Sequence, residues 1–133
     1  MIRILSLCFF CLVLSVVPGC FRATGEVQFH GKVTVDGVPA DMGVIEFEPV
    51  NRDTASGGGV IGKGGVYTAK VMPGEKIVRI KANKILKEYD APDGTHIVDQ
   101  ESLIPEEKSW NKSELHETIT TKTKELNFDL KSN

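Results

Sequence analysis

A glycine-rich segment has residues at the spacing that two kinds of phosphate-binding loop use. Gly57, Gly59 and Gly62 match a dinucleotide-binding fingerprint. Lys63 follows Gly62, as a lysine follows the last glycine of the loop that binds nucleoside triphosphates, but no Ser or Thr comes next to hold magnesium. Both motifs need a helix directly afterwards, whereas the residues after Lys63 favour a turn and a strand. We therefore interpret the segment as a flexible edge strand with its hairpin and predict no cofactor.

The histidines and the acidic turns give little support for a metal site. The three histidines, His30, His96 and His116, lie far apart, and none belongs to an HExxH or HxxE arrangement that would supply two zinc ligands. The Asn and Asp residues of the loops carry oxygen ligands that calcium prefers, but ordinary turns require the same residue types. Ser56 lacks the glycine spacing of a nucleophile elbow. We predict no metal site and no catalytic residue.

Two aromatic side chains are the strongest candidates for ligand contact. Tyr89 and Trp110 are the large amphipathic aromatics outside the predicted strands, and both lie in a segment without hydrophobic alternation. An exposed ring of this kind can stack on a sugar or anchor a partner protein. The alternative for Trp110 is a packing role, in which its ring covers apolar side chains at one end of the domain.

The first nineteen residues have the pattern of an export signal. A positive start at Arg3 precedes an apolar run from Ile4 to Val17 that only two serines interrupt, and the run ends at Pro18-Gly19. A bilayer-spanning helix needs about 20 apolar residues. Residues 1–19 therefore favour a signal peptide over a permanent membrane helix.

The end of this leader reads Val17-Pro18-Gly19-Cys20. It resembles the bacterial lipobox, in which an aliphatic residue and two small residues precede an invariant cysteine. The resemblance implies cleavage before Cys20, a lipid on its sulfur and a lipidated tether over residues 20–25. Membrane lipid is then a partner, because each buried methylene contributes about 0.8 kcal/mol. The alternative is an ordinary secretory peptide, cleaved near Thr24, that leaves a soluble secreted or periplasmic protein.

The cysteine count agrees with export and lipid attachment. Cys8 and Cys11 lie inside the leader, so Cys20 is left alone and no internal disulfide forms. Phe21 occupies the position after Cys20, where an Asp commonly retains lipoproteins of Gram-negative bacteria at the inner membrane. The sequence therefore predicts an exported protein, lipid-anchored to the cell envelope, at the outer membrane or the cell surface.

The rest of the chain is predicted to form one all-β domain. The 133 residues carry a net charge of -2, which leaves no positive field for binding nucleic acid. Period-two alternation and Gly- or Pro-containing turns indicate seven strands, at residues 27–35, 44–48, 56–61, 66–71, 75–82, 118–122 and 125–130. Residues 84–117 lack this alternation. We predict that they form a long loop excursion, which is functional or partly helical from Pro105.

Several turn and core positions occur in a familiar order: Gly31 to Pro39 with its Asp36-Gly37 turn, Val44 to Pro49, Gly65 to Tyr67 and Pro73 to Val78. This order resembles the transthyretin-like (prealbumin-like), carboxypeptidase regulatory-like β-sandwich of small bacterial lipoproteins. The similarity extends over nearly all of residues 26–131 and implies a single Greek-key sandwich of seven strands with a long loop insertion. Turn and core positions imply a fold and say almost nothing about activity.

Together these features predict a non-enzymatic exported lipoprotein that presents a β-sandwich for binding or structural roles in the cell envelope. Its expected partners are membrane lipid through Cys20 and envelope proteins or glycans. The alternative is a carbohydrate- or peptidoglycan-binding module that uses Tyr89 and Trp110. A hydrolase is the third hypothesis, and only generic Ser and His residues are candidates for its catalytic groups.

Overall fold

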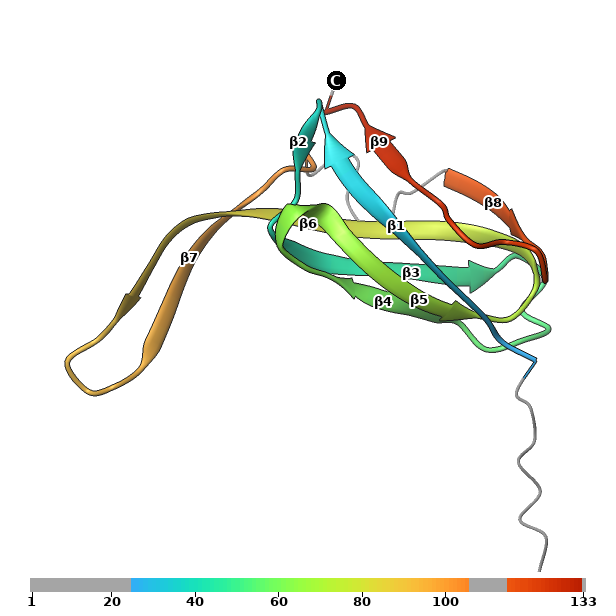
Figure 1. Cartoon of the computed structure of the whole chain (residues 1–133), viewed down its shortest axis with the longest axis horizontal. Coiled ribbons are helices and arrows are strands. Elements are labelled where there is room, and N and C mark those ends of the chain that lie inside the picture. The colour runs from blue at the N-terminus through green and yellow to red at the C-terminus, as the bar shows by residue number, and fades with distance from the viewer. Residues whose placement is uncertain (1–24, 106–114, 133) are drawn as a thin grey trace, which may run out of the picture.

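The computed structural model describes residues 25–105 and 115–132, which form an all-β fold (Figure 1). The strands are β1 (Val27–Val35), β2 (Val38–Pro39), β3 (Met42–Pro49), β4 (Gly57–Ile61), β5 (Val66–Val71), β6 (Gly74–Asp90), β7 (His96–Ser102), β8 (Leu115–Ile119) and β9 (Phe128–Leu130). A short 3-10 turn, η1 (Lys63–Gly65), precedes β5. The predicted all-β class is confirmed.

The strands form one curled sheet with the order β2-β1-β5-β4-β3-β6-β7, while β8 pairs with β6 and β9 pairs with β1. Neighbouring strands are antiparallel except β1 and β9, which are parallel and place Val33 beside Phe128. β1 is a regular half-buried strand, because its alternate residues are buried. A hydrogen-bonded path thus joins all the strands of the described residues into one sheet.

The curl of this sheet creates the core. Phe29 on β1 and Phe47 on β3 are three strands apart, which in a flat sheet would separate them by roughly 14 Å. Their ring centroids instead lie 5.3 Å apart in an edge-to-face contact. Phe128 on β9 adds a third ring, with its centroid 6.3 Å from that of Phe47. The sheet therefore folds over on itself, and its concave face is the buried one.

Each of the seven predicted strands overlaps a strand of the structure, although β8 begins before the predicted 118–122 and β9 covers only the end of the predicted 125–130. Two strands, β2 and β7, were not predicted. The finer expectation of a transthyretin-like sandwich stays a prediction, because the described strands share one continuous sheet.

The predicted long loop over residues 84–117 is wrong for its first half. Residues up to Asp90 continue β6, and β7 follows antiparallel to them, so a β-hairpin occupies most of residues 84–102. The alternation that marks a strand is absent here for two reasons. A bulge between Ile85 and Lys87 changes the phase of the strand, and neither face of this hairpin is packed on the core. Residues 106–114 lie outside the described residues.

Candidate functional site

The hairpin of residues 84–102, here called the arm, extends beyond the body of the protein (Figure 1). β6 pairs with β3 only as far as Asn83, which lies opposite Met42. From Lys84 onward its partner is β7. No residue of the arm belongs to the core of the described residues. The arm is therefore a two-stranded ribbon outside the core, and most of its residues are exposed, while Ile85, Ile97 and Val98 are half-buried.

The base of the arm is held by side-chain hydrogen bonds. The Asp41 carboxylate accepts a 3.0 Å bond from the Ile85 N–H. Asn83, which is buried, donates through Nδ2 to Oε1 of Gln100 at 2.7 Å. The bulge directly after this point leaves Leu86 without a partner residue in the β6–β7 register and 62% exposed. The arm therefore starts from a firm base and presents a large apolar side chain just beyond it.

The tip of the arm is a well-formed turn. The Ala91 N–H donates to the Thr95 carbonyl at 2.8 Å, and Gly94 has a φ of 85°, which favours glycine. The Asp93 carboxylate accepts a 2.9 Å bond from the Thr95 N–H, and this backbone bond lowers the pKa of Asp93. On the strands beside it, Nδ1 of His96 lies 2.8 Å from Oδ1 of Asp90. Local bonds thus define the shape of the tip.

Opposite residues on the arm are complementary, but its net charge is negative. Lys84 lies opposite Glu101, Lys87 opposite Asp99 and Tyr89 opposite Ile97, all on one face of the ribbon. The whole arm has two lysines against five carboxylates, those of Glu88, Asp90, Asp93, Asp99 and Glu101. With His96 neutral, the arm has a charge of -3, so it is an acidic ribbon with apolar side chains on it.

The structure places Tyr89 on this arm, 40% exposed. The Lys87 ammonium lies 4.9 Å from the centroid of its ring, which is a cation–π distance. One face of the ring is therefore already in contact with a cation. Trp110, the second predicted aromatic, and Cys20, the predicted lipid site, lie outside the described residues, so the structure does not test whether either joins Tyr89.

The glycine-rich segment is a strand inside the sheet. β4 lies between β3 and β5, so the expectation of a flexible edge strand is wrong, and the next elements are η1 and β5 rather than a helix that could hold phosphate. A Cβ atom at Gly58 would collide with the Ile45 carbonyl oxygen, and one at Gly59 would collide with that of Thr68. Close approach of the neighbouring strands is the physical reason for these glycines.

The three histidines lie on separate elements. His30 is on β1, His96 is on the arm, and His116 on β8 has its Nδ1 3.9 Å from Oε1 of Glu75. Within residues 25–105 and 115–132, no three His, Cys, Asp or Glu side chains are grouped as metal ligands would be.

Sequence reasoning missed a buried cation. The Lys76 side chain is only 1% exposed, and its Nζ donates to the Thr54 hydroxyl at 3.1 Å. On the neighbouring strand β8, Glu117 is the residue directly opposite. The sequence contains a signal for this burial. Lys76, Val78 and Ile80 are alternate residues of one strand, so they lie on the same face, and that face is buried.

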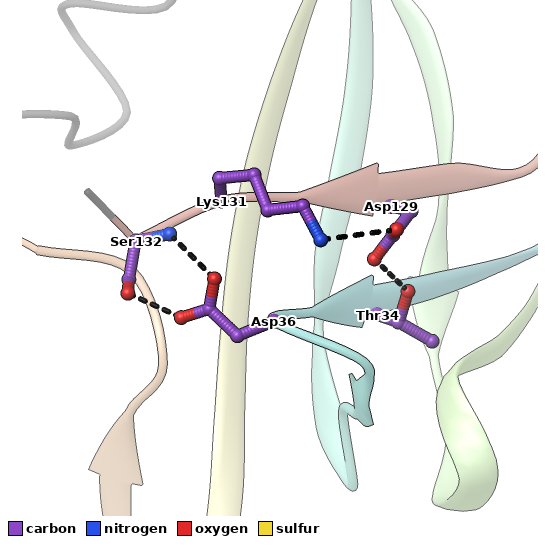
Figure 2. Close-up of polar contacts among 5 residues, drawn as sticks. All are labelled: Thr34, Asp36, Asp129, Lys131 and Ser132. Carbon is purple, nitrogen blue, oxygen red and sulfur yellow. Dashed lines mark hydrogen bonds and ion pairs between the residues drawn. The ribbon is translucent and has the colours of Figure 1, made fainter.

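A polar cluster, here called the clasp, joins the end of β9 to the β1–β2 turn (Figure 2). The Ser132 N–H donates to Oδ1 of Asp36 at 3.2 Å, and the Ser132 hydroxyl donates to Oδ2. Asp129 accepts a 2.8 Å bond from the Thr34 hydroxyl and a 3.4 Å bond from Nζ of Lys131. The Asp36-Gly37 turn itself has positive φ at both residues, as predicted for a tight turn.

The clasp makes the stability of the fold depend on pH. The Ser132 hydroxyl and N–H lower the pKa of Asp36, and the Thr34 hydroxyl followed by Lys131 lowers the pKa of Asp129. A carboxyl with a lowered folded-state pKa stabilises the fold above its ordinary pKa of about 3.9, and this stabilisation is lost as the pH falls further. We expect Asp36→Asn to unfold at a lower temperature than the wild type at pH 6, and the two midpoints to converge near pH 2. A gap of equal size at both pH values would contradict this assignment.

Comparisons with known proteins add little. No family model and no curated protein matches the chain. Among solved structures, a 9R-lipoxygenase from Cyanothece PCC8801 has 12% sequence identity and a TM-score of 0.40, and the match covers 81% of this chain and 16% of the lipoxygenase chain. Likeness at this level assigns neither fold family nor activity. In the described part of the chain, no helix has the length and apolar character needed to cross a membrane. The structure therefore defines an all-β protein with a curled sheet and a projecting arm.

Proposed function

We propose that this chain is a non-enzymatic, exported lipoprotein, anchored to the cell envelope through Cys20, that uses the arm as its contact surface. The observation that carries the proposal is the exposure of Leu86 and Tyr89 on a ribbon none of whose residues belongs to the core of the described part of the chain. A lone two-stranded hairpin is marginal in water, and apolar side chains on such a ribbon are typical of a surface that a partner covers. The partners in this proposal are envelope proteins or glycans.

The anchor and the arm complement each other. In this proposal residues 20–25 are the short tether that precedes β1, and lipid on Cys20 would hold the body close to the membrane surface. Anchoring at the outer membrane or cell surface then restricts the arm to partners within a short distance. We also propose that the body is the transthyretin-like, carboxypeptidase regulatory-like sandwich, and the contact between Phe29 and Phe47 across the curled sheet supports this.

Fatty-acid labelling tests the anchor. In bacterial cells that produce the full chain, we expect label on the wild type and none on Cys20→Ala, because Cys20 is the cysteine left after cleavage of the leader. Cys11→Ala is the matched control, since Cys11 lies in the leader, and it should carry as much label as the wild type. Equal label on Cys20→Ala would exclude the anchor and favour the soluble exported alternative.

A carbohydrate- or peptidoglycan-binding role is the second candidate, and it rests on Tyr89. The ring is partly exposed, and its contact with Lys87 leaves the other face for stacking on a sugar. Loss of glycan binding in Tyr89→Ala, with Leu86→Ala as the control, would distinguish this role from a general contact role of the arm.

A further inference from the structure

A second exposed apolar surface lies on the convex, outward face of the sheet. Val44, Val60 and Val66, here called the valine patch, are 43%, 74% and 56% exposed. Val44 on β3 and Val60 on β4 are directly opposite each other. Since Ile61 pairs with Tyr67, Val66 on β5 is diagonal to Val60 on the same face. Three neighbouring strands thus contribute to one apolar surface.

Two lysines border the valine patch, and an open groove adjoins it. Exposed lysines lie opposite its two outer members, Lys32 opposite Val66 and Lys81 opposite Val44. Beside Val44 and Val60, an open groove of about 410 Å³ runs over β4, where Gly57 to Gly59 place no side chains. Glu46 also lines this groove, and the cationic Arg79 of β6 lies directly opposite Glu46. The valine patch therefore offers apolar contact, positive charge at its borders and room for a side chain.

The arm has the complementary properties. It carries Leu86 and Tyr89 as exposed apolar side chains, and its net charge is negative. Two arms would repel each other, and so would two lysine-bordered patches, because like charges across an interface oppose association. An arm against a valine patch instead brings opposite charges and apolar surfaces together. Because the arm extends beyond the body, a second copy can supply it (Figure 1).

We infer that the arm of one copy docks on the valine patch of a second copy. This inference rests on the proposed contact role of the arm and names its partner. In one docking contact the arm of one copy meets the patch of another, so one copy keeps a free patch and the other keeps a free arm. Association then either closes, as a reciprocal dimer or a larger ring, or continues as an open chain.

A mixing experiment tests the inference. The full chain, solubilised in detergent, is analysed by sedimentation with the detergent mass subtracted. Leu86→Asp disables the arm and Val60→Asp disables the patch, and both positions are exposed enough to leave the core intact. We expect the average mass of the wild type to rise with concentration and each variant to associate at least about 30-fold more weakly. An equimolar mixture of the two variants should form dimers, because one intact arm still meets one intact patch.

The controls separate folding from docking. Thermal unfolding of each variant should match the wild type, and Val44→Asp provides a second patch variant if Val60→Asp does not. A wild type that stays monomeric, or a mixture that stays monomeric while the wild type associates, would overturn the inference. If copies of the chain do not dock on each other, the inference fails, but the arm can still contact other envelope components. If the arm contacts no partner at all in cells, the proposed function fails as well.

Discussion

A chain in which Gly31 is replaced by alanine is expected to lose about 3 to 5 kcal/mol of stability, the sum of steric strain and a buried hydrogen bond lost. Gly31 on β1 is buried and lies opposite Tyr67 on β5. A Cβ atom there would collide with the Leu126 carbonyl oxygen and would lie 2.8 Å from Cε1 of Tyr67. The segment before β9 therefore runs parallel to β1 and approaches it so closely at Gly31 that only glycine leaves room.

The collision also breaks a buried bond. The Tyr67 hydroxyl donates to the Leu126 carbonyl at 2.6 Å, and burial, with a smaller contribution from the Glu117 carboxylate, raises the pKa of Tyr67. The hydroxyl thus stays protonated and needs this acceptor. Denaturant unfolding measures the loss. Gly62→Ala is the matched control, because a Cβ there meets only the Val66 carbonyl oxygen at 3.8 Å, and it should change stability little. Equal stability of Gly31→Ala and the wild type would contradict this close approach of the two segments.

Phe47→Ala should cost about 3 to 5 kcal/mol by leaving a cavity where the folded-over sheet meets itself. Phe47 is fully buried and its ring contacts those of Phe29 and Phe128, which come from strands at the other end of the sheet order. Removing it therefore weakens the contact that keeps the sheet curled. Val44→Ala changes an exposed residue of the same strand, and should stay within about 0.5 kcal/mol. Equal losses for Phe47→Ala and Val44→Ala in denaturant unfolding would show that Phe47 does not hold the curl.

The sequence predicted the position of a strand best where one face of that strand is buried. Alternation along Val27–Val35 located β1 with its correct ends, and the Asp36-Gly37 dipeptide located the turn after it. The arm was not predicted, because alternation of apolar and polar residues arises where one face of a strand is buried, and neither face of the arm is packed on the core. The bulge at Leu86 removed what phase information was left.

The candidate site was predicted only in part. Tyr89 was singled out as an aromatic outside the strands, yet it lies within β6, and Leu86 beside it was not singled out at all. The glycine run could not be interpreted correctly either, since its cause is the carbonyl groups of β3 and β5, which only the folded sheet brings close. The roles of Cys20 and Trp110 stay predictions.

Photo-crosslinking in cells tests most directly whether the arm is the contact surface. A photoreactive amino acid replaces Leu86 in the full chain, and the same amino acid at the exposed Lys122, in the segment between β8 and β9, is the control. We predict crosslinks from position 86 and few from position 122. A second copy as the product supports self-docking, and a glycan strand selects the carbohydrate-binding role. Crosslinks from position 122 with none from position 86 would show that the arm is not the contact surface.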